Sequence, residues 1–362
     1  MSLAFLLIWM PLPVFLPPSL FFLLVLLVYD TAFTFVYVSV EAMLVDLSKD
    51  PGVRSTANAW AAAASCVSSG LAVFTSTHMY DADAMQGFRY MAAALAVLAL
   101  AMFLVAMRML DRAAAAAPRR VLTKTAMSHL IRSGRSVRDF LVDLRRVVAN
   151  RNFLIFVVVA ALQTTLCAFT VNMLPLHLEA FGAETSNSLL LAAVFVLPHV
   201  VVILMRPLVV QWGADAVIRS LFWTRVCVAL FASTISSPSV AIGALILSRI
   251  LVESTCRQLN LVTAELADDD QEEHGESESR AGLILGVAAL ISKPGESLGP
   301  VIGWWLLGPK NDDAPAIGDS VEFRLLAVIV VAVPGTIAAL QAFLWTFLDH
   351  HEKKVPGKAV QV

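Results

Sequence analysis

Long apolar stretches separated by short polar connections run along nearly the whole chain. A helix needs about 20 mostly apolar residues to cross the hydrocarbon core of a bilayer. In lipid, the backbone must also satisfy its hydrogen bonds within the helix itself. The pattern therefore predicts about ten transmembrane helices. We place them at residues 2–16, 19–45, 55–77, 89–107, 152–176, 188–205, 218–233, 240–257, 282–307 and 322–348.

The composition is that of an integral membrane protein. Of the 362 residues, 58% are hydrophobic and only 15% are charged, and the mean hydropathy of +0.77 lies far outside the range of soluble domains. Because all the cysteines fall within predicted spans, we expect them to be small buried thiols, neither disulfides nor metal ligands. They are Cys66, Cys167, Cys227 and Cys256.

The polar connection at 108–151 orients the chain. It holds eleven basic residues against three acidic ones, and basic loops stay in the cytoplasm. It divides the chain into an N-terminal half at 1–107 and a C-terminal half at 152–349, and the cytoplasmic tail is 350–362. We expect both termini to be cytoplasmic and the plasma membrane to be the location. The basic residues are Arg108, Arg112, Arg119, Arg120, Lys124, Arg132, Arg135, Arg138, Arg145, Arg146 and Arg151.

Four predicted spans precede this loop and six follow it. Many secondary transporters consist of two six-helix halves joined by a long cytoplasmic loop. We therefore expect an all-α fold of the 4 + 6 type, in which two helices are missing at the N-terminus relative to 6 + 6.

Two stretches resemble one transporter family. Residues 29–60, "YDTAFTFVYVSVEAMLVDLSKDPGVRSTANAW", are similar to the fourth helix and following loop of the glycoside, pentoside and hexuronide cation symporter branch of the major facilitator superfamily. Residues 264–305, which include "LISKPGESLGPVIGWW", resemble its tenth loop and eleventh helix. The similarity extends to the last span. It implies the major facilitator fold and transport by alternating access.

Lys293 lies near the middle of a predicted span, where a charge costs about 2.5–3.5 kcal/mol on insertion scales. One interpretation is a neutralised pair with Glu296, three residues further on the same helical face. The other, implied by the resemblance, is that Lys293 faces a central cavity beside an acidic cation site, with its charge balanced by Glu41 or Glu253. Pro294 loosens the helix, and a stripe of small residues allows a neighbouring helix to approach closely. The stripe is Gly295, Gly299 and Gly303.

Two other spans carry charges. Arg249, Glu253 and Arg257 are spaced four residues apart, so they either neutralise one another or line the cavity. Asp30 and Glu41 lie close to one face of their helix, because eleven residues make about three turns. The resemblance implies an acid that binds the coupling ion in this helix, but Tyr37 stands at that position, so coupling to Na⁺ or H⁺ is in doubt.

Charged residues also frame the predicted cytoplasmic connections. In the superfamily, acid and base pairs at such places close the inward gate. As exposed pairs, each would contribute only about 0–1 kcal/mol, and ordinary solvated loop charges are the alternative. The candidates are Asp46 and Arg54 in the first half and Glu265, Asp269 and Arg280 in the second, where 257–280 is expected to be a loop.

Other features have two interpretations. The histidines His177 and His199 are either hydrogen-bonded packing residues or a proton relay. Residues 131–148, "IRSGRSVRDFLVDLRRVV", are either a basic amphipathic helix on the anionic inner leaflet or a simple tether.

The sequence contains no phosphate-binding glycine loop, metal-ligand cluster or nucleophile arrangement. We therefore expect no enzyme, cofactor or metal. The leading hypothesis is a monomeric secondary transporter for a sugar or other small organic solute, coupled to Na⁺ or H⁺ if it is coupled at all. Its partners would be the solute and the lipid bilayer, without nucleic acid. The alternative is a scaffold or receptor subunit that keeps the transporter fold without transporting.

Overall fold

The computed structural model describes residues 2–9, 17–79, 86–116, 137–174, 188–232, 234, 237–274, 281–307 and 320–348. Within these ranges the secondary structure is helical and contains no strands. The helices are α1 (Ser2–Trp9), α2 (Pro18–Leu47), α3 (Pro51–Met79), α4 (Gln86–Ala116), α6 (Val137–Ala149), α7 (Arg151–Asn172), α9 (Ser188–Trp212), α10 (Ala214–Ala232), α11 (Pro238–His274), α12 (Ala281–Leu307) and α13 (Ser320–Trp345).

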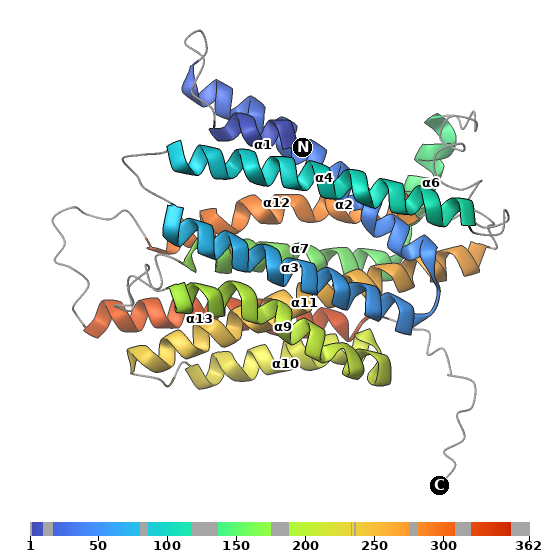
Figure 1. Ribbon diagram of the computed structural model, residues 1–362. Helices are drawn as coiled ribbons and strands as arrows, with labels where there is room; N and C mark the ends of the chain where they lie inside the picture. The colour runs from blue at the N-terminus through green and yellow to red at the C-terminus, as the bar shows by residue number, and fades with distance from the viewer. Residues whose placement is uncertain are drawn as a thin grey trace.

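The long helices lie side by side and run along one common axis (Figure 1). Each of the ten predicted spans coincides with one helix in the predicted order, although residues 10–16 of the first span lie outside the described ranges. Among the described residues, six helices contain stretches that are long and apolar enough to cross a membrane, namely α2, α3, α4, α7, α9 and α12. The all-helical membrane fold that the hydropathy pattern predicts is therefore confirmed.

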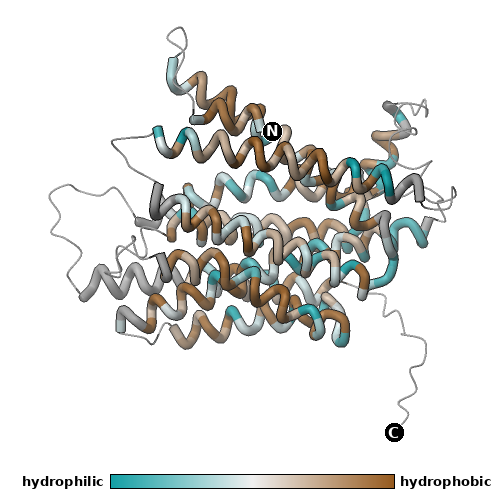
Figure 2. The backbone as a smooth tube through the Cα atoms, viewed as in Figure 1, coloured by the Kyte–Doolittle hydropathy of each residue, from teal (hydrophilic) through white to brown (hydrophobic). Residues whose placement is uncertain are grey.

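The lateral packing follows from the side chains that each helix presents. Figure 2 shows apolar residues along most of the length of the helices. On α2 and α4 many large apolar side chains are exposed, including Leu23, Phe35, Val97 and Met102, as expected for surfaces that face lipid. The main buried cluster draws many of its members from α7, α10 and α11, and Phe156, Ile218, Phe222 and Val262 are among its most buried side chains. The helices that bury large apolar side chains against one another therefore form the core of the bundle, and those that expose them lie at its surface.

Helices α7 and α12 pack closely because of the predicted glycine stripe. A Cβ atom built on Gly299 would lie 2.5 Å from the backbone nitrogen of Phe169 and 2.6 Å from the carbonyl oxygen of Thr165, both on α7. A Cβ atom on Gly303 would collide with the side chain of Met173. Only glycine leaves room for such an approach. The predicted close contact is confirmed, and its partner is α7. Helix α12 continues through Pro294 and Pro300.

The expected loop at 257–280 is wrong for most of its length, because α11 continues as far as His274. The acidic run does not break the helix, since Glu and Gln are good helix formers. Several side chains of the extension are also buried, including Val262, Asp268 and Asp270. Tertiary packing and ion pairing therefore extend the helix into a region that we expected to be a solvated loop.

Candidate functional site

Lys293 lies at the centre of α12 and connects it to α2. Its Nζ atom is 2.8 Å from Asp30 Oδ1 and 2.9 Å from Glu296 Oε2, and it sits 5.8 Å from the ring centroid of Phe33. The side chains of Asp30 and Glu296 remain about half exposed, at 52% and 50%. Charged groups in membrane spans face the bundle interior or a water-filled path. This cluster therefore places one basic and two acidic side chains together between α2 and α12.

The structure brings together parts of both interpretations of Lys293. Glu296 is a partner, as the pairing interpretation expects, and a second partner comes from another helix, as the cavity interpretation expects. That second partner is Asp30 and not Glu41 or Glu253. Eleven residues of helix separate Asp30 from Glu41, which is about 16 Å along the axis.

Glu41 takes part in a second contact between the halves, further along α2. Asn260 of α11 donates a hydrogen bond from Nδ2 to Glu41 Oε1 at 3.0 Å. The hydroxyl group of Tyr37 donates to Asn260 Oδ1 over 3.4 Å. Tyr37 and Glu41 are four residues apart and so lie on the same face of α2. Asn260 was not among the sequence candidates, because nothing in its local sequence marks it.

The charges of α11 form the predicted ladder. Arg249 Nη1 lies 3.0 Å from Glu253 Oε2, and Arg257 Nε lies 3.6 Å from Glu253 Oε1. Arg257 also donates to the hydroxyl oxygen of Ser65 on α3 at 2.7 Å. The ladder is therefore an internal ion pair that reaches across to the N-terminal half. His199 of α9 is buried and lies near these charges, whereas His177 lies outside the described residues.

A buried ion pair joins the halves at one end of the bundle. Arg54 donates from Nη1 to Asp268 Oδ2 at 2.7 Å and from Nη2 to Asp268 Oδ1 at 3.2 Å, and it also donates to the carbonyl oxygen of Val45. The two charged side chains are only 4% and 9% exposed. The expectation of a weak, exposed pair is therefore wrong for Arg54, because the continuation of α11 covers it.

The other predicted gate residues are not part of the ion pair between Arg54 and Asp268. Glu265 and Asp269 are half-buried residues of α11 on either side of Asp268, and both take part in further interactions. The side chain of Asp46 and all of Arg280 lie outside the described parts of the structure.

A polar network inside the C-terminal half was missed. Arg225 of α10 is 2% exposed and donates to Gln163 Oε1 of α7 at 3.1 Å and to Gln341 Oε1 of α13 at 2.6 Å. Gln163 in turn donates to the carbonyl oxygen of Val252 on α11 at 2.7 Å. The network thus ties four helices together. The sequence could have indicated this network, since an arginine within a predicted span marks a functional or structural site.

The expectation that all cysteines are unpaired is wrong for Cys167 of α7 and Cys256 of α11, whose sulfur atoms are bonded. Their Cα atoms are 7.8 Å apart, which is wider than usual for a disulfide. Helix packing places the two residues together despite a sequence separation of 89. No pattern along the chain reveals such a pair.

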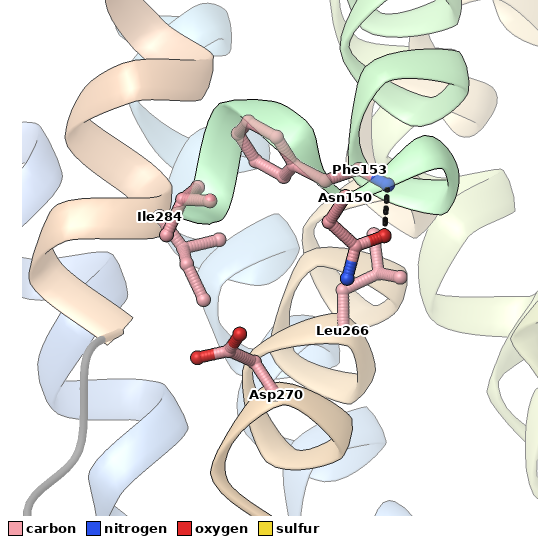
Figure 3. Close-up of a pocket in the computed structure, with 6 residues that line it drawn as sticks. Asn150, Phe153, Leu266, Asp270 and Ile284 are labelled. Atoms are coloured by element: carbon pink, nitrogen blue, oxygen red, sulfur yellow. Dashed lines mark hydrogen bonds between the residues drawn. The ribbon is translucent and has the colours of Figure 1, made fainter. Parts of the chain in front are cut away.

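A small cavity lies where α6 meets α7 (Figure 3). Its volume is about 10 Å³, room for about one water molecule and too small for an organic solute. The lining residues are Val147, Asn150, Phe153, Leu266, Asp270 and Ile284. Within the described residues, no group of three or more His, Cys, Asp or Glu side chains could hold a metal ion.

Comparisons with known proteins agree with the all-helical membrane fold. The family model described as "MFS/sugar transport protein" matches residues 1–350. Transmembrane protein 180 of chicken (Gallus gallus) is 27% identical over 370 residues, which cover 93% of this chain and 72% of the relative. Transmembrane protein 180 of mouse (Mus musculus) is 27% identical over 394 residues, which cover 98% of this chain and 75% of the relative. No solved structure matches the chain.

Proposed function

Because this chain belongs to the family of MFS/sugar transport proteins, we propose that it carries a small organic solute across a membrane by alternating access, working as a monomer. In such transporters the two halves rock about a site near the midplane. The proposed path runs between α2 on one side and α11 and α12 on the other. It is lined by the cluster at Lys293 and by the contact between Glu41 and Asn260.

The observation that carries this proposal is a series of polar contacts between the halves. They include four contacts that connect residues of α2 or α3 with residues of α11 or α12, from mid-helix to one end of the bundle. Polar contacts in lipid are retained where they serve a path, a relay or a packing contact. Polar contacts can break and re-form with other partners as the two halves rock, which a purely apolar interface between the halves would not require. The four are Asp30–Lys293, Glu41–Asn260, Ser65–Arg257 and Arg54–Asp268.

We further propose that the pair between Arg54 and Asp268 is the cytoplasmic lock. The positive-inside rule orients its end of the bundle toward the cytoplasm. Both hydrogen bonds between these side chains are charge-assisted, and the one from Nη1 is short. The pair therefore stabilises the closed state of the cytoplasmic end.

The substrate class and the coupling ion are the finer parts of the proposal. The family description supports the proposal of a sugar, although fold alone is a weak guide to substrate. The acids Asp30, Glu41 and Glu296 supply carboxylates for Na⁺ or H⁺ along the path. Uptake of radiolabelled sugars into proteoliposomes with an imposed sodium or proton gradient tests both parts. Uptake that is the same under both gradients and without them contradicts coupling.

A cysteine placed between the halves tests alternating access without knowledge of the substrate. We suggest Ser65→Cys in a background with Cys66→Ala and Cys227→Ala, labelled with a membrane-impermeant maleimide from the cytoplasmic side. We expect slow labelling while Arg54 and Asp268 are paired and labelling at least ten times faster in Arg54→Gln, because the cytoplasmic end then opens. Lys49→Cys is the control, since Lys49 is exposed in the connection between α2 and α3. Equal rates at position 65 with and without the lock argue for a static scaffold.

The role of Lys293 is tested by paired substitutions. Removing one member of a charge pair leaves the other uncompensated, whereas removing both is close to neutral for folding. We expect Lys293→Met with Glu296→Gln, and Lys293→Met with Asp30→Asn, to reach the cell surface yet fail to transport. Full transport in either double variant would reduce the cluster to a structural contact between α2 and α12.

A further inference from the structure

Helix α6 lies across the direction of the spanning helices at the end of the bundle (Figure 1). Only Asn150 separates its last residue, Ala149, from Arg151, the first residue of α7. The side-chain oxygen of Asn150 accepts a hydrogen bond from the backbone nitrogen of Phe153 at 3.2 Å and so caps α7. Because α7 spans the membrane, α6 is held at the level of the lipid headgroups and parallel to the membrane surface.

The apolar face of α6 is only partly covered by protein. Val147 is 2% exposed and Leu144 packs against the main buried cluster, so these two side chains attach the helix to the bundle. Phe140 and Leu141 belong to the same apolar side by helical spacing, yet they are 52% and 54% exposed. The anchored part of the face therefore continues into an apolar surface that the described chain leaves open.

Basic residues flank this surface. Arg138 and Arg145 are seven residues apart and so share one side of the helix, and both are exposed. They border the apolar face on the side of Leu141. A helix with exposed apolar residues at headgroup level and arginines along its border fits the boundary between acyl chains and anionic headgroups.

We propose that α6 docks on the anionic lipid of the leaflet at its end of the bundle, with Phe140 and Leu141 inserted below the headgroups and Arg138 and Arg145 on phosphate or carboxylate groups. With the orientation proposed above, this is the cytoplasmic leaflet. A lipid surface fits better than a protein partner because the helix lies in the membrane plane directly beside its own spanning helix. Docking fixes the depth of α7 through the single residue Asn150.

Two positions on α6 provide a matched test. Phe140 and Val142 are exposed to nearly the same degree, 52% and 49%, but they point about 200° apart around the helix. We suggest Phe140→Cys and Val142→Cys spin labels on the whole protein, with Cys66 and Cys227 replaced by Ser and the labelled background protein as the blank. The protein is placed in nanodiscs of phosphatidylcholine, with or without about 30% phosphatidylserine, which brings the surface potential into the range that attracts basic segments.

In discs with phosphatidylserine, we expect the label at position 140 to collide with oxygen and to be shielded from a water-soluble nickel chelate, while the label at 142 stays open to the chelate. Removal of each arginine, in Arg138→Gln and Arg145→Gln, should lower the docked to undocked ratio about fivefold. Equal chelate access at 140 and 142 would overturn docking. Shielding of 140 from oxygen as well would indicate a protein contact instead, and equal shielding in both lipids would overturn the role of anionic headgroups.

Discussion

Gly299→Ala adds a single methyl group to α12 where it packs against α7, and this group should push the two helices apart. In Gly299→Ala the new Cβ atom would lie 2.5 Å from the backbone nitrogen of Phe169, about 0.9 Å short of an ordinary contact at 3.4 Å. The opposing atoms at the shortest distances belong to the backbone of α7, so no side chain can rotate away. The helices must move apart by roughly 1 Å, a gap at which packed atoms lose a quarter to a half of their dispersion energy.

The matched control is on the same helix. A Cβ atom on Gly286 meets nothing within 4 Å, so Gly286→Ala should be neutral or more stable by about 0.5–1 kcal/mol, since alanine favours a helix. Overpacking in Gly299→Ala costs about 1–3 kcal/mol. Gly303→Ala should fall between the two, because the atoms it meets belong to the flexible side chain of Met173.

Thermal unfolding of the detergent-purified protein, followed by the loss of the monodisperse peak in size-exclusion chromatography, measures these differences. A difference of about 2 kcal/mol corresponds to roughly 3 °C in Tm for a chain of this length, because the shift is the free-energy difference divided by the entropy of unfolding. We expect the order Gly286→Ala, Gly303→Ala, Gly299→Ala from most to least stable. If Gly299→Ala melts within about 1 °C of Gly286→Ala, the argument from close backbone approach is wrong.

Three further predictions address the lock, the cysteines and the topology. Arg54→Gln should destabilise the fold by about 3–5 kcal/mol, since it leaves Asp268 buried without its cation, while Arg54→Leu with Asp268→Leu should recover most of that loss in the same melting assay; equal losses would contradict a buried pair. Mild oxidation should lower the number of thiols that react with maleimide in the denatured protein from four to two, as read by mass spectrometry, and Cys256→Ser should abolish the loss at Cys167; four reactive thiols after oxidation would contradict the pairing. Tags within residues 115–125 and after Lys358 should be reached only from the cytoplasm, and a tag at Ala183 only from outside; shielding of the tag at Ala183 in surface-expressed protein would contradict the ten-span topology.

The sequence was sufficient for the order and approximate position of the apolar helices, because membrane insertion depends on summed hydropathy over about 20 residues. That sum is a local property, so the spans coincide with the observed helices. The glycine stripe was equally readable, since the spacing of Gly295, Gly299 and Gly303 requires only one helix. The extension of α11 was not predicted, because it depends on a contact that is distant in sequence. An acidic run resembles a solvated loop until its partner Arg54 is known.

The sequence alone could not predict which charged residues on different helices pair with one another. Asp30 and Glu41 are equivalent candidates for Lys293 by composition and by face, and only the relative depth of α2 and α12 decides between them. Asn260 and Asp268 have no local signal, because their roles arise from packing against α2 and α3. Arg225 was a visible exception, since a charge within an apolar span always requires an explanation.

The unbroken length of α11 has a mechanical consequence. The helix runs from Pro238 to His274 without interruption, with Glu253 among the charges at membrane depth and Asp268 at the lock. Fifteen residues separate these two, or about 22 Å of rigid rod. A tilt of about 10° around Glu253 would displace Asp268 by about 4 Å, more than the length of its hydrogen bonds to Arg54. In the proposed alternating-access cycle, α11 therefore acts as a lever arm, in which a small rotation at the proposed solute path and the release of the proposed lock are one and the same motion.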